Sequence, residues 1–321
     1  MSSEAGAGST EAVVVEGLTY RYGERVALDE VGFSVEEGEI FGLLGPNGGG
    51  KTTLFSLLSS LRAVPAERIR VFGRDLGAAP AEVRRQIGVV FQAASLDPNL
   101  TVEENMMHQG HLYGLRGVPL ASRSAELAGR LGFAERFGDR VAKLSGGLQR
   151  RVEIAKSLLH GPRLLLLDEP STGLDPGIRR ELWTLLEELR RDDGVTILLT
   201  THFMEEGDRC DRVGLLDRGR LAAIGAPETL KKEVGGQVVR LATSRPREVV
   251  ERVERRFGVE AQATGPVVQF ELEGAHERVV ELVEAISGSI HSITVAQPTL
   301  EDVFLRRTGH AFWESGRQGE A

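Results

Sequence analysis

The sequence has one cysteine, a deficit of basic charge and no long apolar run, and each shortage excludes a class of protein. Cys210 is the single cysteine among 321 residues, so neither an intrachain disulfide nor a cysteine-based metal cluster can form. No run approaches the roughly 18 apolar residues of a spanning helix, and the first ten residues lack the basic and apolar segments of a signal peptide. Acidic residues outnumber basic ones by 47 to 39, which disfavours nucleic acid and anionic lipid as partners. We therefore expect a cytoplasmic protein without direct lipid insertion, which contacts a membrane only through a partner.

The length favours two domains, and the pattern of apolar runs divides the chain accordingly. Short β-branched or leucine-rich runs alternate with amphipathic stretches, which is typical of a parallel sheet wrapped by helices. We predict strands at Ala12–Tyr20, Glu39–Leu44, Arg68–Phe72, Gly88–Phe91, Arg163–Leu167, Val195–Thr201 and Arg212–Leu216, and helices at Lys51–Leu61, Leu148–His160 and Gly177–Arg191. The run Leu164–Leu167 is apolar without alternation, as in a central strand buried on both faces.

Two segments depart from this alternation. From Thr101 to about Arg140 helix follows helix, which indicates a helical insertion. After Gly236 the order β-α-β-β-α-β, closed by a helix from Pro298, suits a small ferredoxin-like α+β domain. We therefore expect a disordered tail at 1–11, a main domain at 12–236 with a helical subdomain at about 93–147, an accessory domain at 237–309 and a frayed tail at 310–321.

A glycine-rich segment after the second predicted strand carries the first chemical signal. Residues Gly45–Thr53 fit the pattern G-x-x-x-x-G-K-[ST] between a strand and a helix. The loop consists of Gly45, Pro46, Asn47, Gly48, Gly49 and Gly50, and we expect its four glycines to adopt positive φ so that successive N–H groups converge on an anion. The helix that follows adds the positive end of its dipole. The plainer alternative, a glycine-rich turn with an exposed lysine, does not account for this strand and helix context.

The residues that open the helix supply the groups that phosphate and metal need. Lys51 is expected to reach the β- and γ-phosphates of a nucleotide, and the Thr52 hydroxyl to bind Mg²⁺. Thr53 lies within reach of the α-phosphate. The sequence thus predicts a site for a nucleoside triphosphate.

Two carboxylates follow the predicted central strand. Asp168 and Glu169 stand at its carboxyl end, which is the ligand side of such sheets. We expect Asp168 to hold Mg²⁺ through water, and Glu169 to act as the general base that polarises the attacking water. The alternative is that both are only exposed at a strand end, and the phosphate loop makes that alternative weak.

Between the phosphate loop and the acidic pair, Leu144-Ser-Gly-Gly-Leu-Gln-Arg-Arg151 resembles the signature motif of ATP-binding cassette (ABC) proteins. Leu148 stands where the commonest signature has glutamine. Ser145, Gly146 and Gly147 precede a helix, so their N–H groups form a second anion site. In the family this site closes over ATP held by a second cassette, so the resemblance implies two ATP molecules sandwiched head to tail in a homodimer.

Four further motifs follow the family's order along the chain. By this resemblance Tyr22 stacks on adenine, and Gln92 senses Mg²⁺ and the attacking water. The loop Ser171–Pro176, which contains Asp175, crosses between cassettes, and His202 contacts the γ-phosphate. Each motif alone has a plainer interpretation, such as a surface aromatic or a turn histidine, but coincidence in order and register is improbable.

The resemblance implies an α/β fold of the P-loop NTPase type. Its parts are a RecA-like core, an antiparallel β subdomain and a helical subdomain, followed here by the small α+β domain. It also implies an ATPase with ATP and Mg²⁺ as cofactors, and a separate integral-membrane permease as partner at the inner face of the plasma membrane. Leu100–Asn105 resembles the corresponding opening in exporters of the second ABC export class. Gln297–Gly309 resembles the C-terminal motif of daunorubicin-resistance-type cassettes. The i, i+3, i+4 spacing of Leu300, Val303 and Phe304 also fits the core face of an ordinary terminal helix.

Three other functions stay open at this point. A non-transport ABC ATPase of the DNA-repair type needs a long coiled coil, whereas 53 positions separate Gln92 from Ser145. A nucleotide-binding regulator with little turnover is disfavoured by the presence of Glu169 and His202. An exporter of polysaccharide would need a sugar-stacking platform, and the short terminal domain has few aromatic residues.

Overall fold

A computed structural model describes residues 11–286 and 290–312. The described chain forms two compact units, the first ending at Ile224 and the second beginning at Gly225. This boundary precedes the one expected at Gly236, because helix α8 (Pro227–Lys232) packs against α11 (Leu300–Thr308) within the second unit.

The first unit is built on a six-stranded sheet with the order β10-β9-β3-β8-β7-β6. Its strands are β3 (Ile40–Leu44), β6 (Ile87–Val90), β7 (Leu164–Asp168), β8 (Thr196–Thr201), β9 (Arg212–Asp217) and β10 (Arg220–Gly225). The pairs β3–β8, β3–β9, β6–β7 and β7–β8 are parallel, as predicted. Every residue of β7 is buried, in agreement with its uninterrupted apolar sequence.

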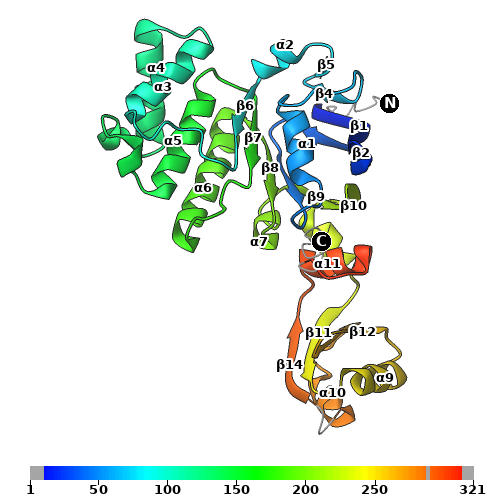
Figure 1. Cartoon of the computed structure of the whole chain (residues 1–321). Coiled ribbons are helices and arrows are strands. Elements are labelled where there is room, and N and C mark those ends of the chain that lie inside the picture. The colour runs from blue at the N-terminus through cyan, green and yellow to red at the C-terminus, as the bar shows by residue number, and fades with distance from the viewer. Residues whose placement is uncertain (1–10, 287–289, 313–321) are drawn as a thin grey trace, which may run out of the picture. The chain divides into compact units, whose positions relative to one another are not determined.

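Helices cover this sheet on both sides (Figure 1). They are α1 (Lys51–Leu58), α5 (Gly146–Leu158), α6 (Pro176–Asp193) and the short α2 (Pro80–Arg84) and α7 (Met204–Gly207). The three long helices coincide with the predicted ones apart from their ends. Loops continue from the carboxyl ends of the parallel strands, and ligands bind at this edge in such sheets.

A second sheet of the first unit is antiparallel, with the order β2-β1-β4-β5. Its strands are β1 (Glu11–Tyr22), β2 (Arg25–Glu36), β4 (Ile69–Val71) and β5 (Arg74–Asp75). The sequence pattern did not indicate β2. Glu30 has a positive φ of 53°, so the buried positions change from the even-numbered Leu28 to the odd-numbered Val31. That shift breaks the two-residue alternation by which a half-buried strand is recognised.

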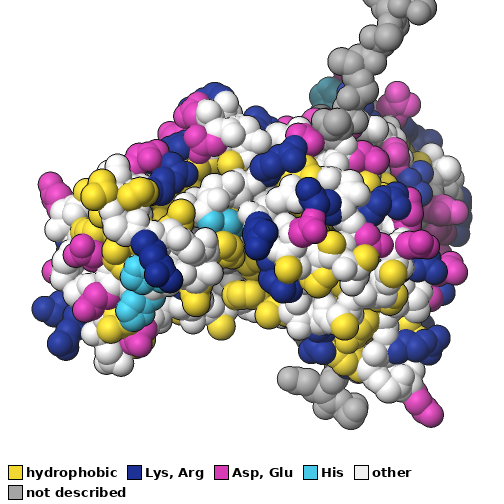
Figure 2. All heavy atoms as spheres, turned by 90° about the horizontal axis from the view of Figure 1, so that it is seen from above, with side chains coloured by type: hydrophobic (Ala, Val, Ile, Leu, Met, Phe, Trp, Pro, Cys, Tyr) yellow, Lys and Arg dark blue, Asp and Glu magenta, His cyan; other side chains and the backbone are white. Residues whose placement is uncertain are grey.

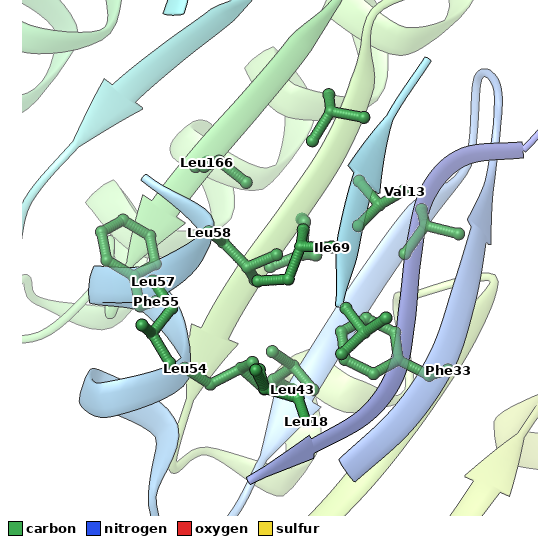
Figure 3. Packing of buried hydrophobic residues seen from close by; sticks show 14 of the residues in the cluster. Val13, Leu18, Phe33, Leu43, Leu54, Phe55, Leu57, Leu58, Ile69 and Leu166 are labelled. Atoms are coloured by element: carbon green, nitrogen blue, oxygen red, sulfur yellow. The ribbon is translucent and has the colours of Figure 1, made fainter. Parts of the chain in front are cut away.

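The main core lies between the two sheets, around α1 (Figure 3). Its buried side chains include Val13, Leu18, Phe33, Leu43, Leu54, Phe55, Leu57, Leu58, Ile69 and Leu166. Phe33 and Phe41 stack across it with ring centroids 5.2 Å apart. Burial of each such side chain stabilises the fold by about 1.5–3 kcal/mol, so the core fixes α1 and hence the loop before it.

The segment 101–143 is helical, as expected. It contains α3 (Val102–Leu112), α4 (Gly117–Arg130) and the 3₁₀ turns η1 (Ala134–Arg136) and η2 (Val141–Lys143). Thr101 and Glu104 form a reciprocal capping box at the start of α3, which satisfies two N–H groups of its first turn.

The second unit has the predicted β-α-β-β-α-β order followed by α11. Its elements are β11 (Gln237–Thr243), α9 (Pro246–Phe257), β12 (Ala261–Thr264), β13 (Val267–Leu272), α10 (Val279–Ala285) and β14 (Ile290–Ala296). The sheet order β12-β13-β11-β14, with antiparallel neighbours throughout, agrees with the expected ferredoxin-like arrangement. Helix α10 begins later than the predicted Ala275, and the predicted limits Ser287 and Ser289 lie outside the described residues.

The expected tails require two corrections. Glu11 is part of β1, paired with Glu36, although a disordered tail to residue 11 was expected. Phe312 is buried against Phe304, with ring centroids 5.1 Å apart, so the frayed end does not begin at residue 310. Residues 1–10 and 313–321 lie outside the described chain. None of the helices within the described ranges is both long and apolar enough to cross a membrane.

Candidate nucleotide site

The predicted phosphate loop connects β3 to α1 at the carboxyl end of the parallel sheet. Gly48 and Gly50 have positive φ values of 79° and 109°. The expectation of positive φ is wrong for Gly45 and Gly49. At these two positions neighbouring carbonyl oxygens leave too little room for a Cβ atom. A Cβ on Gly45 would lie 2.2 Å from the carbonyl oxygen of Leu216. The loop therefore uses two of its glycines for the turn and Gly45 for close contact with β9.

The Lys51 side chain folds back over this loop and is only 4% exposed. Its Nζ donates to the carbonyl oxygens of Gly45 at 2.7 Å and Pro46 at 3.1 Å. Oε1 of Glu169 lies 3.5 Å from the same ammonium. Burial lowers the pKa of Lys51, and the nearby carboxylate of Glu169 partly opposes that change.

Glu169 is the point at which three separate segments meet. Its Oε2 accepts hydrogen bonds from Gln92 Nε2 at 3.4 Å and Thr172 Oγ1 at 3.1 Å. His202 Nδ1 lies 3.0 Å from the same oxygen. These residues follow β6, β7 and β8, three adjacent parallel strands whose carboxyl ends lie at one edge of the sheet. The structure thus brings together Lys51, Glu169, Gln92 and His202, and adds Thr172.

Asp168 ends β7 and is buried. Its Oδ1 accepts a hydrogen bond from the Thr200 hydroxyl at 2.5 Å, and that hydroxyl oxygen accepts the Glu169 N–H at 3.0 Å. Burial raises the pKa of Asp168, while the Thr200 hydrogen bond opposes the increase. The sequence placed Thr200 in the segment that carries His202 but gave this hydroxyl no role of its own, because its contact with Asp168 joins two strands.

These groups border a cavity of about 660 Å³. Its lining consists of Tyr22, Arg25, Val26, Ala27, Pro46, Asn47, Gly48, Gly50, Lys51, Thr52, Thr53, Gln92, Glu169 and Arg218. Tyr22 is 41% exposed, with its hydroxyl 3.5 Å from Thr53 Oγ1. No motif marked Arg25 and Arg218 as lining residues, because β2 and the turn after β9 reach the cavity only through tertiary contacts. One such contact joins the Gly219 N–H to the Gly49 carbonyl at 2.9 Å.

The second predicted anion site does not line this cavity. Ser145 caps α5, accepting a hydrogen bond from the Leu148 N–H at 3.4 Å. Asp175 caps α6 in the same manner, with the Gly177 N–H at 3.0 Å and the Ile178 N–H at 3.1 Å. Their immediate contacts are therefore those of helix caps, and the structure does not join them to the cavity of their own chain.

The residues expected to hold Mg²⁺ have suitable chemistry. Thr52, Gln92 and Asp168 offer a hydroxyl, an amide oxygen and a buried carboxylate, and Mg²⁺ prefers oxygen ligands shared with phosphate and water. In the described ranges, no group of three or more His, Cys, Asp and Glu side chains is placed to hold a metal. The donor set fits a cation that is bound together with a nucleotide.

The fold and the cavity together define a P-loop nucleoside triphosphatase. The family model for the ABC transporter matches residues 28–172. The linearmycin resistance ATP-binding protein LnrL of Bacillus subtilis is 36% identical over 303 residues, covering 92% of this chain and 97% of its own. The daunorubicin resistance ATP-binding protein DrrA2 of Streptomyces coeruleorubidus is 38% identical, covering 93% and 95%. The chain belongs to the ABC transporter family.

Solved structures agree with this assignment. The cassette cbiO1 of Clostridium perfringens, part of the transporter complex cbiONQ, superposes with a TM-score of 0.64 at 28% identity, covering 78% of this chain and 96% of that one. The cassette MJ0796, bound to ADP and phosphate after hydrolysis, superposes with a TM-score of 0.60 at 28% identity, covering 67% and 98%. The chain is an ABC-type ATPase that uses ATP and Mg²⁺.

Proposed function

We propose that this chain is the ATP-hydrolysing subunit of a bacterial exporter, in which two copies act on a separate permease at the inner face of the plasma membrane. The similarity that supports export extends well beyond the cassette. The two resistance proteins each match more than nine-tenths of this chain, so the match reaches into the second unit. The permease selects the cargo, which we take to be a drug-like, lipophilic or lipid-linked compound.

The observation that carries the hydrolytic part of the proposal is the convergence of three donors on one oxygen of Glu169. In the proposed reaction the Lys51 ammonium leaves the Glu169 carboxylate and binds the β- and γ-phosphates instead. Glu169 then accepts a proton from the water that attacks the γ-phosphorus, and the bond to the ADP oxygen breaks. His202 stabilises the γ-phosphate oxygens, and Tyr22 stacks on the adenine.

Thr52, Gln92 and Asp168 are the proposed holders of Mg²⁺. When bound, Mg²⁺ neutralises part of the phosphate charge that develops during transfer. The raised pKa of Asp168 reflects the cost of a buried carboxylate, and a cation beside it would offset that cost.

The second anion site supports the proposed dimeric state. Ser145, Gly146 and Gly147 form the N-terminal end of α5, where N–H groups and the helix dipole favour an anion. Because these residues do not line the cavity of their own chain, we propose that they close over the ATP of a second copy. Asp175 would lie in the loop that crosses between the copies. ATP then favours the closed pair through its contacts with both chains.

A smaller cavity of about 240 Å³ is the proposed docking place of the permease. Its lining comes from the ends of α1 and α2, from residues on either side of Gln92, and from the ends of α3 and α5. These residues are Ser59, Arg84, Ile87, Val89, Phe91, Ser95, Gln109, Tyr113, Lys156, Ser157 and His160. Leu112 and Val118 are each 81% exposed nearby in sequence. Figure 2 shows hydrophobic, basic and acidic side chains intermixed on the face seen from above. A permease segment with apolar and acidic side chains would match this lining.

The test is a pull-down from native membranes with the Glu169→Gln chain in saturating ATP. We expect recovery of a polytopic membrane protein together with the chain. A matched pull-down without nucleotide controls for adhesion to membranes. Recovery of soluble partners or nucleic acid alone would refute the exporter function and leave the ATPase standing.

A further inference from the structure

Arg150 is a buried arginine on the second turn of α5, with a relative exposure of 8%. It has no part in the reaction described above. Its guanidinium donates to the carbonyl oxygens of Phe91 at 2.7 Å, Pro170 at 2.8 Å, Glu169 at 3.3 Å and Asp168 at 3.4 Å, and to Glu153 Oε2 at 2.8 Å. One side chain therefore binds the main chain on both sides of the general base and directly before Gln92.

These carbonyl groups need such a partner because the β6–β7 ladder has ended. The last paired residues are Val90 and Leu167, and the next carbonyls lie beyond the register of that pair. A buried carbonyl without a donor is costly, and a planar guanidinium offers five N–H groups in a fixed fork. Arg150 thus supplies to two diverging strand ends the hydrogen bonds that the ladder no longer provides.

The same face of α5 also holds the loop after Gln92. Glu153 Oε1 accepts the Ser95 N–H at 2.6 Å, while its other oxygen pairs with Arg150. Lys156 Nζ donates to the Ser95 carbonyl at 2.7 Å and to its hydroxyl at 2.9 Å. Residues three apart on a helix lie on one face. The helix that begins at Ser145 is therefore bonded to the segments that carry Gln92 and Glu169.

We propose that Arg150 is a positioning residue for hydrolysis, which holds the main chain around Gln92 and Glu169 in register with the signature helix α5. This inference rests on the proposed function. There, the N-terminal end of α5 serves the ATP of one site while Glu169 serves the other. Because Arg150 bonds α5 to the main chain around Glu169, the helix and the base move together. A shift of α5 on dimer closure therefore also moves the base.

The test compares Arg150→Gln with Arg151→Gln. Arg151 is the adjacent control, since it is more exposed and bonds instead to the Leu131 carbonyl and to Glu181. We expect Arg150→Gln to lower kcat about tenfold or more, because displacement of catalytic groups by about 1 Å costs up to 10²-fold. The Kd for ATP should change less than about threefold, because Arg150 has no hydrogen bond to the phosphate loop. Phosphate release and equilibrium binding of a fluorescent ATP analogue give the two quantities.

Two conservative variants separate positioning from folding. Arg150→Lys keeps the charge but reaches fewer carbonyls, and Glu153→Gln keeps the shape but weakens the pair with Arg150. We expect both to melt below the wild-type temperature because a buried ion pair is weakened, yet to stay folded at the assay temperature and to lower kcat with unchanged Kd. Equal kcat for the Arg150 and Arg151 variants, or parallel loss of kcat and binding in the conservative variants, would overturn the inference. Glu169→Gln in the same assay tests the proposed function by itself, since normal turnover there would refute that function whatever Arg150 does.

Discussion

Glu169→Gln tests the proposed chemistry most directly. The amide oxygen can still accept from Thr172 and Gln92, so the local geometry should persist. The amide cannot accept a proton from water, and loss of a general base costs about 10²–10⁴ in rate, or about 3–5 kcal/mol of barrier. Binding should hold or improve, because Lys51 no longer has to leave a carboxylate 3.5 Å away to reach phosphate.

The assay combines phosphate release with gel filtration in saturating ATP and Mg²⁺. We expect turnover to fall at least about 10²-fold while an ATP-dependent dimer accumulates. Glu187→Gln is the control, because that carboxylate is only partly buried, lies outside the lining of the cavity and forms its ion pair with Arg209. Turnover of the Glu169 variant within about threefold of the wild type would refute the general-base role. A monomer at saturating ATP would refute the sandwich.

Two further changes test packing and titration. Gly45→Ala should lower the free energy of unfolding by about 1–3 kcal/mol and weaken ATP binding, because the new methyl group meets the Leu216 carbonyl at 2.2 Å. Gly129→Ala, whose Cβ would meet no atom within 4 Å, should stabilise the fold by up to about 1 kcal/mol in the same thermal melts, because alanine favours the interior of helix α4, and equal losses in both variants would contradict the packing argument. Burial lowers the pKa of His160 below its ordinary 6.5, so the folded state binds the proton less readily than the unfolded chain. Stability present above pH 6.5 should therefore be lost as the pH falls, and His160→Gln should flatten that part of the melting-temperature profile, whereas identical profiles would argue against it.

The sequence predicted the parallel strands and the long helices because their signals are local. An apolar run such as Leu164–Leu167 and the loop–helix junction before Lys51 are each contained in a few residues. It failed where one residue changes the period, as Glu30 does in β2. It also failed where a glycine serves a contact instead of a turn, as Gly45 does. The boundary near Ile224 was missed because it depends on the packing of α8 against α11.

The candidate site shows the same division. The sequence predicted the motif residues Lys51, Glu169, Gln92 and His202 from spacing and resemblance. In the structure, polar atoms of the other three lie around the carboxylate of Glu169. Nothing local marked Arg218 as part of the cavity wall. Arg218 lines the cavity because the turn after β9 contacts the phosphate loop, and this contact forms only in the folded chain.

The sequence by itself determined the class of protein, because a phosphate loop, an acidic strand end and a signature helix each carry their chemistry within a short segment. Tertiary structure alone decided which groups hold these segments in register. The β6–β7 ladder ends at Val90 and Leu167, and the carbonyls of Phe91 and Pro170 beyond it accept hydrogen bonds from Arg150, which lies on another element. A hydrogen bond of that kind depends on where the folded chain places its donors, and no local pattern of residues specifies it.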